Sequence, residues 1–465
     1  MIRAWHAELA WLPGQGVCPD VLIEADADRF TAVTPGVRPG DIPAELRPAC
    51  TRLPGLTLPG LANGHSHAFH RALRGATQQA AGTFWDWRER MYQVAASLDP
   101  DSYLELARAV YAEMALAGIT CVGEFHYLHH GPGGTPYADP NEMGRVLLGA
   151  AVEAGIRITL LDTCYLTGGL AADGQPEPLT GTQLRFGDSG GEAWAARAGA
   201  LGADEHGQLG PAARVGAAIH SVRAVPLDQM QPVIAWAQRS GAPLHAHLSE
   251  QHAENEASLA AYRRTPAEVL YDAGALGPRA TLVHATHLAG HDIDLLGGSR
   301  VFACLCPTTE ADLADGIGPA RDLADAGATL TLGTDSHAMI DMFEEARLVE
   351  YSERIATGQR GNFRAGALAR AASTDGHASL GWPDAGEIAS GAIADLITVA
   401  LDTSPRLAGA TPKTVLPSVI FAGSAADVRH VVVGGEDVVR DGRHLLLDDV
   451  PAALAAAVDR VLSQD

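Results

Sequence analysis

Short apolar runs alternate with longer amphipathic segments from about residue 57 to residue 385. Eight of these runs have the length and the bounding residues of buried strands. They span residues 57–67, 119–128, 157–166, 214–222, 242–250, 280–288, 301–310 and 329–337. Helical spacing is clearest in residues 102–118, 141–155 and 265–276, and the last of these begins with a Thr-Pro start signal. Eight strands that alternate with helices predict a (β/α)₈ barrel of the TIM type. A doubly wound open sheet is the alternative, but no Gly-rich phosphate-binding turn supports it.

The two ends of the chain have a different pattern. Residues 1–57 and 386–447 contain short strand-like pieces, the first with many Pro and Gly. We expect the two segments to form one small β-sandwich domain outside the barrel of residues 58–385, with a C-terminal helix over residues 448–465. Residues 168–210 are rich in Gly and polar residues, which predicts a long loop over the barrel mouth.

Nearly every strand-like run of the predicted barrel ends in residues that bind metals or transfer protons. The carboxyl ends of barrel strands converge on one mouth, so these residues are expected to lie together although they are far apart in the sequence. They are His65, His67, Glu124, His126, His220, His247, Glu250, His284, His287, Glu310, Asp335 and His337.

The sequence His-Ser-His at residues 65–67 suggests a metal site. Alternate residues of a strand share a face, so His65 and His67 point the same way. With His247 and Asp335 they would supply the three or four ligands that hydrolytic zinc requires. His245 is an alternative for the third nitrogen, but His247 lies nearer the carboxyl end of its strand.

The charge of the chain restricts the class of binding partner, and its lysine content restricts the number of bound metal ions. The formal net charge of −23 argues against binding to nucleic acid or to an anionic membrane and favours a small-molecule partner. Of the 33 basic residues only Lys413 is a lysine. Two-metal hydrolases of this type usually use a lysine or carboxylate on the fourth strand as a bridge. Residues 214–222 contain neither, which predicts a single metal.

The chain has no signal-like leader, no membrane-length apolar stretch and no disulfide-like cysteine spacing, so we expect a cytoplasmic protein. Cys304 and Cys306 lie in an apolar run and are expected to be buried thiols.

The motifs His-Ser-His (65–67), His-Leu-Ser-Glu (247–250), His-Ala-Thr-His (284–287) and Gly-Thr-Asp-Ser-His (333–337) resemble the amidohydrolase superfamily, in particular its mononuclear deaminating branch. Longer strings, residues 84–92, 124–130, 219–225 and 306–316, resemble the formimidoylglutamate deiminase family of bacterial histidine degradation. The resemblance implies hydrolysis of N-formimidoyl-L-glutamate to N-formyl-L-glutamate and ammonia by a homodimer with one zinc ion, or another divalent transition metal, per chain. The chain departs from the family in one place, because His70 stands where the family has a substrate-contacting Gln.

The resemblance and the chemistry of the reaction together imply roles for the predicted site residues. Asp335 would accept a proton from the attacking water, Glu250 would pass a proton to the leaving nitrogen, and His284 would stabilise the tetrahedral centre. The substrate is a dicarboxylate amidine, and planar Arg side chains suit carboxylates best. Substrate binding is therefore expected from Arg88, Arg223, Tyr127, His220 and His70. His126, His129 and His130 are expected to be structural or to support the site.

Three other interpretations remain open at this stage. A deaminase of a purine, pyrimidine or triazine ring would share every metal and proton-transfer residue and differ only in the distal pocket. A catalytically silent relative would be expected to lack one of these residues, and none is missing. Arg88 lies in an aromatic segment that also fits a surface helix with Arg88 on its solvated side.

Overall fold

The computed structural model describes residues 2–78, 84–171, 173–203 and 209–463. Its centre is a parallel sheet of eight strands, neighbours in chain order, and a bridge between Ser66 and Asp335 joins the first strand to the segment after the last. The strands are β5 (Leu61–Ser66), β6 (Ile119–His126), β7 (Arg157–Cys164), β10 (Ala213–Ile219), β11 (Leu244–Leu248), β12 (Ala280–His284), β13 (Phe302–Leu305) and β14 (Thr329–Leu332). All eight predicted strands and the barrel are confirmed, and the open doubly wound sheet is excluded.

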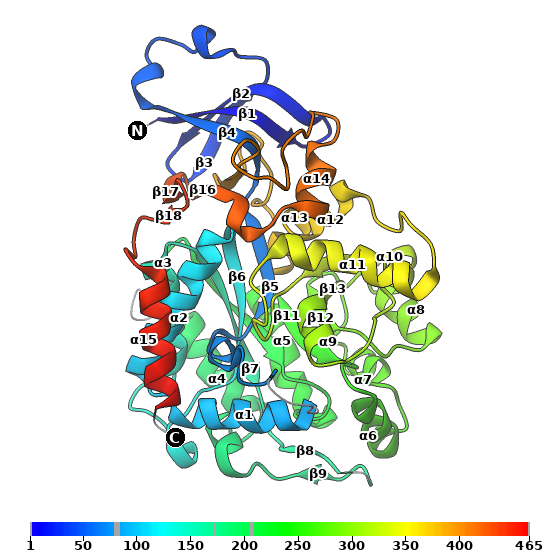
Figure 1. The fold of residues 1–465 in the computed structure, drawn as a ribbon. Helices are drawn as coiled ribbons and strands as arrows, with labels where there is room; N and C mark the ends of the chain where they lie inside the picture. Colours follow the sequence, from blue (N-terminus) through cyan, green and yellow to red (C-terminus); the bar gives the residue numbers. More distant parts are fainter. Residues whose placement is uncertain (1, 79–83, 172, 204–208, 464–465) are drawn as a thin grey trace.

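The helices surround the barrel or connect it to the rest of the chain (Figure 1). Their starts follow local signals: Asp99 caps α2 by accepting a hydrogen bond from the Ser102 backbone N–H at 2.7 Å, and Thr265 caps α7 in the same way through Glu268. The helices are α1 (Phe84–Ser97), α2 (Pro100–Leu116), α3 (Glu142–Ala154), α4 (Gly191–Gly202), α5 (Met230–Ser240), α6 (His252–Tyr262), α7 (Pro266–Asp272), α8 (Gly290–Gly298), α9 (Pro307–Asp312), α10 (Ala320–Ala326), α11 (Met342–Thr357), α12 (Ala365–Ala371), α13 (Thr374–Ser379), α14 (Val415–Ala422) and α15 (Val450–Leu462).

A second sheet of eight strands combines both ends of the chain, as predicted. Its order is β18-β17-β16-β15-β4-β1-β2-β3, and every pair is antiparallel except β1 with β4. The C-terminal helix α15 leaves this sheet and packs along α2 (Figure 1). The strands are β1 (Arg3–Leu12), β2 (Gly16–Asp26), β3 (Arg29–Thr34), β4 (Cys50–Pro59), β15 (Leu396–Val399), β16 (Val428–Val433), β17 (Glu436–Arg440) and β18 (Arg443–His444).

Within the predicted long loop of residues 168–210, the described residues 168–171, 173–203 and 209–210 hold more regular structure than we predicted. It holds a short hairpin of β8 (Gly169–Leu170) and β9 (Pro176–Glu177), the 3₁₀ helix η5 (Gly181–Arg185) and the helix α4. Glycine has a low helix propensity, and this hid α4 in the sequence. Tertiary packing overrides that propensity, because Trp194 and Leu201 are buried and the Trp194 ring lies 5.7 Å from that of Trp236 on α5.

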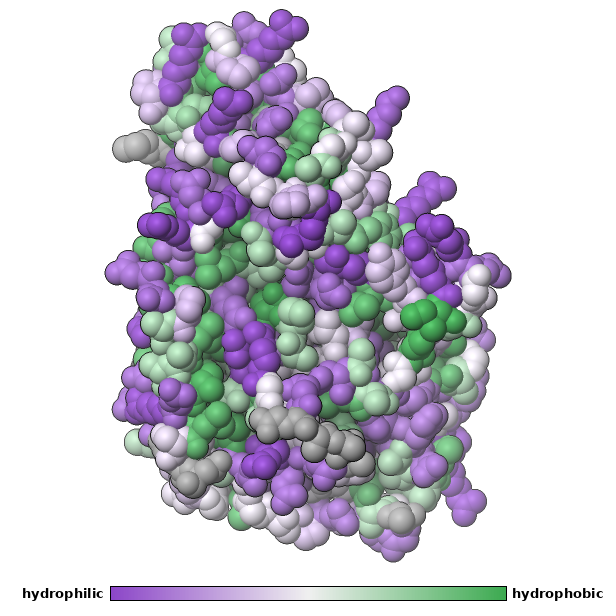
Figure 2. Space-filling model, in the orientation of Figure 1, coloured by the Kyte–Doolittle hydropathy of each residue, from purple (hydrophilic) through white to green (hydrophobic). Residues whose placement is uncertain are grey.

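The surface shown in Figure 2 mixes polar side chains with small apolar patches. Among the described residues, no helix combines the length and the hydropathy needed to cross a membrane. The helix α1 and the β8–β9 hairpin lie at the end of the barrel opposite the small sheet (Figure 1). They therefore cover the end where the barrel strands terminate and where the predicted site residues should meet.

Candidate active site

The predicted metal ligands meet at the carboxyl ends of three strands. His65 lies in β5 and His247 in β11, His67 directly follows β5, and Asp335 is the third residue after β14. The Nε2 atoms of His247 and His65 are 3.1 Å apart. The Oδ1 atom of Asp335 lies 3.4 Å from Nε2 of His65 and 3.5 Å from Nε2 of His67. All four side chains are buried. The ligand atoms of His65, His67 and His247 lie within 4.8 Å of one another, and Asp335 falls in a second such group with His67 and His70.

The orientation of these rings fits a bound metal ion. Nδ1 of His67 lies 2.9 Å from the carbonyl oxygen of Phe125, and Nδ1 of His247 lies 2.9 Å from that of His220. A carbonyl oxygen only accepts, so each Nδ1 carries the hydrogen and each Nε2 presents a lone pair to the cluster. Burial lowers the pKa of His65, lowers that of His67 to about 3 and lowers that of His247 well below its ordinary value. Neutral imidazoles and a carboxylate that converge in this way suit a divalent transition metal.

The structure brings His247, and not His245, to this cluster. Nε2 of His245 lies 3.1 Å from the carbonyl oxygen of Ser379, and His245 belongs to none of the possible metal-binding groups of the described residues.

Glu250, His284 and Asp335 form a chain of titratable groups beside the cluster. Nε2 of His284 lies 3.8 Å from Oε1 of Glu250 and 3.9 Å from Oδ2 of Asp335. Burial raises the pKa of Glu250, although His284 and Arg223 oppose the change. Burial acts to lower the pKa of His284, but nearby carboxylates, Glu250 first, outweigh it and raise this pKa well above its ordinary value. Shifts of this kind in a cleft are typical of groups that exchange protons during catalysis.

Asp335 stays ionised in this setting. Burial acts to raise its pKa, but His65, His284 and His67 outweigh that effect and hold the pKa well below the usual range. The backbone here is unusual, since Asp335 has φ of 41° and His284 has φ of 69°. Residues other than glycine rarely adopt such angles, and they cluster at functional sites. The backbone N–H of Asp335 donates to the carbonyl of His65 at 3.0 Å, which helps to hold this conformation.

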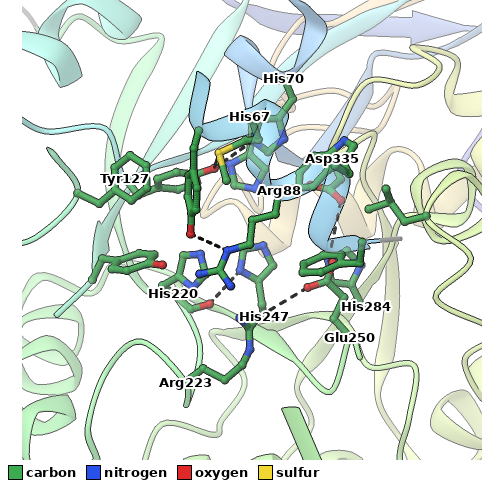
Figure 3. A pocket seen from close by; sticks show the side chains of 17 residues that line it. His67, His70, Arg88, Tyr127, His220, Arg223, His247, Glu250, His284 and Asp335 are labelled. Atoms are coloured by element: carbon green, nitrogen blue, oxygen red, sulfur yellow. Dashed lines mark hydrogen bonds and ion pairs between the residues drawn. The ribbon is translucent and has the colours of Figure 1, made fainter. Parts of the chain in front are cut away.

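A pocket opens from the cluster toward α1 and the loops that follow β6, β7 and β10. It has an empty volume of about 560 Å³, including solvent at its mouth. The side chains labelled in Figure 3 point toward this common space. Every predicted substrate-binding residue lines it, namely His70, Arg88, Tyr127, His220 and Arg223. Its walls are otherwise mainly aromatic, with Phe84, Trp87, Tyr92, Tyr165 and Phe186.

The two arginines of the pocket have different surroundings. Arg88 donates from Nε to the Tyr92 hydroxyl at 2.6 Å and from Nη2 to the Gly168 carbonyl at 3.2 Å. Within the described part of the chain, no carboxylate forms an ion pair with Arg88. Arg223, in contrast, lies 3.3 Å from Oε2 of Glu254 through Nε and 3.8 Å from Oε2 of Glu250 through Nη2. The positive charge of Arg88 is therefore the one left for a ligand.

His70 lies between the metal ligands and the pocket. Its Nε2 atom is 3.0 Å from the Tyr127 hydroxyl, and its ring centre is 4.5 Å from that of His67. Its Nδ1 atom is buried and has no hydrogen-bond partner among the described residues. Burial lowers the pKa of His70 well below its ordinary value, so the ring is neutral. A neutral imidazole at the pocket wall can donate or accept a single hydrogen bond to a ligand.

Two residues that shape the site could not be given a specific partner from the sequence. Oε1 of Glu310 lies 3.4 Å from Nδ1 of His284 and accepts the Cys306 backbone N–H at 2.8 Å, so it orients the His284 ring. Its position at a strand end was visible in the sequence, but its partner was not. Gln183 contacts the pocket residue Tyr92 from a segment that the sequence showed only as a loop.

His126, His129 and His130 lie outside the pocket. The nearby Asp162 accepts hydrogen bonds from Arg197 at 2.8 and 2.9 Å, and Nε2 of His129 lies 2.9 Å from the Thr163 carbonyl. This buried network supports the loop after β6.

Comparison with known proteins places the chain in a family. Residues 56–438 match the amidohydrolase family. The chain belongs to this family. The amidohydrolase is 38% identical over 460 residues to formimidoylglutamate deiminase of Pseudomonas aeruginosa. The aligned residues cover 95% of this chain and 96% of that one. It is 32% identical over 394 residues to 8-oxoguanine deaminase of the same organism, covering 83% of each chain. A crystal structure of an amidohydrolase from Brucella melitensis superposes with a TM-score of 0.89 at 33% identity, covering 99% of this chain and 100% of that one.

These relationships make this amidohydrolase a hydrolase that acts on C–N bonds. Its family is metal-dependent, and His65, His67 and His247 form one of the groups of described residues that could hold a metal ion, with Asp335 3.4 Å from His65.

Proposed function

We propose that this amidohydrolase converts N-formimidoyl-L-glutamate and water to N-formyl-L-glutamate and ammonia, as a step in histidine degradation. The observation that carries the proposal is Arg88, a cation without a carboxylate partner among the described residues, in the same pocket as the histidine cluster. Arg88 is partly buried, and removing a cation even partly from water without a counter-charge is unfavourable, so the pocket favours a ligand that brings a carboxylate. The 38% identity to a formimidoylglutamate deiminase supports the same substrate.

One zinc ion, or another divalent transition metal, would be held by His65, His67, His247 and Asp335. When bound, such an ion acts as a Lewis acid and lowers the pKa of a water molecule to about 7. Asp335 accepts the proton that the attacking water loses as its oxygen bonds to the amidine carbon. Glu250 delivers a proton to the terminal nitrogen and, as the bond between that nitrogen and the carbon breaks and ammonia leaves, takes up the proton of the hydroxyl group that becomes the formyl carbonyl. His284 stays protonated beside Glu250 and Asp335, and it stabilises the negative charge that develops on the oxygen.

The rest of the pocket positions the two carboxylates of the substrate. Arg88 forms an ion pair with one of them, and the remaining N–H groups of Arg223 bind the other. Tyr127, His220 and His70 supply hydrogen bonds along the chain between the carboxylates and the amidine. Burial lowers the pKa of His220 well below its ordinary value, so it acts here as a neutral partner.

Ammonia release tests this proposal directly. The purified protein should release ammonia fastest from N-formimidoyl-L-glutamate, more slowly from N-formimidoyl-L-aspartate and N-formimidoylglycine, and not from guanine or adenosine. Release from a purine with none from the formimidoyl amino acids would contradict it.

A ring deaminase is the second candidate, and the aromatic walls of the pocket favour it. Trp87, Tyr92 and Phe186 could stack on a heterocycle, and 8-oxoguanine deaminase is among the relatives. A neutral ring would leave the Arg88 guanidinium without a counter-charge, so we place this function second.

We also propose that the enzyme is cytoplasmic and forms a homodimer. Light scattering of the purified protein would test the dimer.

We predict one metal ion per chain. Elemental analysis of the purified protein should give close to one bound ion, and His247→Gln should lose it because a ligand is removed. His245→Gln is the matched control and should keep the ion, since His245 bonds to the Ser379 carbonyl instead. Close to two tightly bound ions per chain would contradict a mononuclear site.

We predict that His70→Gln is nearly neutral. An amide can make the same hydrogen bond to the Tyr127 hydroxyl that Nε2 of His70 makes at 3.0 Å. The ratio kcat/KM for N-formimidoyl-L-glutamate should stay within about threefold of the wild-type value, because one neutral hydrogen bond replaces another. Loss of activity or of the metal would show instead that His70 is a ligand or a proton carrier.

A further inference from the structure

The hydroxyl group of Tyr92 is arranged as a hydrogen-bond donor to whatever occupies the pocket. Its oxygen accepts two hydrogen bonds, from Nε of Arg88 at 2.6 Å and from Nε2 of Gln183 at 3.0 Å. A phenol oxygen with both acceptor positions filled still has its own proton to donate. Among the described residues no hydrogen bond uses Tyr92 as the donor, and its side chain lines the pocket. Burial, together with Tyr165, raises the pKa of Tyr92 well above its ordinary value, so the proton stays on the oxygen.

The environment of Gln183 determines which way its amide points. Its Nε2 atom faces three oxygens, the Tyr92 hydroxyl at 3.0 Å, the Gly168 carbonyl at 3.0 Å and the Tyr165 hydroxyl at 3.5 Å. Its Oε1 atom faces the backbone N–H of Thr180 at 3.2 Å. The reverse orientation would set the amide oxygen against a carbonyl and the amide hydrogens against an N–H. Gln183 therefore donates to Tyr92, and it does so from outside the pocket lining.

The segment that carries Gln183 is attached to α1, the helix that carries Arg88 and Tyr92. Arg185 is 2% exposed and donates to the carbonyls of Ala95, Ala96 and Leu98 at the end of α1, the last at 2.7 Å. These contacts hold η5 and α1 in one arrangement, so the three side chains keep their relative positions.

Gly168 completes this arrangement, because its carbonyl accepts from both Arg88 and Gln183. A Cβ atom at this position would lie 2.6 Å from the Pro178 carbonyl oxygen, so only glycine allows the approach. Gly168 and Tyr92 thus restrain two sides of Arg88 without supplying a negative charge.

We propose that Tyr92 is a further substrate-binding residue, that Gln183 is a positioning residue acting through it, and that the two complete with Arg88 the site for one carboxylate of the substrate. The inference rests on the proposed function, since it assumes a dicarboxylate ligand. A guanidinium and a hydroxyl side by side can each donate to a different oxygen of one carboxylate, which binds it more specifically than a single cation would. The three residues then distinguish a carboxylate from an uncharged group at that end of the substrate.

Binding of stable product analogues tests the inference without requiring turnover. Calorimetry would measure the affinity of N-formyl-L-glutamate, N-formyl-4-aminobutanoate and N-formyl-L-norvaline, of which the last two each lack a different carboxylate. Tyr92→Phe should weaken N-formyl-L-glutamate binding by roughly ten- to a hundredfold, since a hydrogen bond to a charged group is lost. It should not affect the one analogue that lacks the carboxylate bound by Arg88 and Tyr92.

Gln183→Met should weaken binding in the same ligand-dependent way. When it is introduced into the Tyr92→Phe variant, it should weaken binding by less than about a further threefold, because Gln183 acts through Tyr92. The exposed residues Tyr271 and Gln238 provide matched controls, and Tyr271→Phe and Gln238→Met should bind like the wild type. An equal loss for all three ligands would show a merely structural role and overturn the inference, as would unchanged binding by Tyr92→Phe. Absence of N-formyl-L-glutamate binding in the wild type would overturn the proposed function as well.

Discussion

Replacing Glu250 with Gln is expected to leave the metal in place and to reduce kcat by roughly a hundred- to ten-thousandfold, the range typical of a lost general acid–base group. Glu250 is 7% exposed, and its carboxylate lies 3.8 Å from both His284 and Arg223. Gln has the same shape and can keep these contacts, but it cannot take up and release a proton. Burial raises the pKa of Glu250, so this pKa is closer to neutral pH than that of an exposed carboxyl. A pKa raised in this way suits repeated proton transfer.

The measurements are steady-state kinetics of ammonia release and elemental analysis of the same sample. Glu256→Gln is the matched control, since Glu256 is exposed on α6 and should give wild-type values. Activity of Glu250→Gln near the wild-type level would move the proton transfer to another residue. Loss of the metal together with the activity would mean that Glu250 supports the ligands rather than the chemistry.

The barrel was predictable because strands covered on both faces are almost continuously apolar. The runs of residues 157–166 and 280–288 therefore stand out against the amphipathic helices that follow them. The polar residues at their ends were also visible, since an isolated apolar run that stops in histidines or acids is unusual. Parallel strand order then places those ends together, so His67, His247 and Asp335 could be grouped before their distances were known.

The parts that could not be predicted depend on contacts between distant segments. The sequence does not reveal that Arg223 lies against Glu254 while Arg88 has no such partner among the described residues, although both occur in similarly specific motifs. The left-handed backbone at His284 is set by the surrounding barrel and not by its own residue type. The role of Gln183 was hidden because glycines around it suggested only a loop.

Replacing Arg88 with Met is expected to lower kcat/KM for N-formimidoyl-L-glutamate by roughly 30- to 900-fold, because a desolvated carboxylate loses its cation. This change corresponds to a loss of about 2 to 4 kcal/mol of transition-state stabilisation. Metal content and thermal stability should not change, since no described carboxylate depends on Arg88 for its counter-charge. Arg90→Met provides the control, as Arg90 lies on the same helix and is exposed.

Arg223→Met should behave differently from Arg88→Met, and this contrast separates the two cations. Removing Arg223 leaves Glu254 and Glu250 without the guanidinium that lies 3.3 and 3.8 Å from them, so stability and kcat should fall together with affinity. The loss from Arg88→Met should instead fall mainly on KM, and it should nearly disappear for a substrate that lacks the carboxylate bound there. An Arg88→Met enzyme that is equally impaired on every formimidoyl substrate would show that Arg88 only packs against Trp85 and Tyr92, which lie 5.4 and 5.3 Å from its guanidinium carbon. In that case the charge of Arg88 would have no part in substrate selection, and the assignment of a dicarboxylate substrate would lose the observation on which it depends.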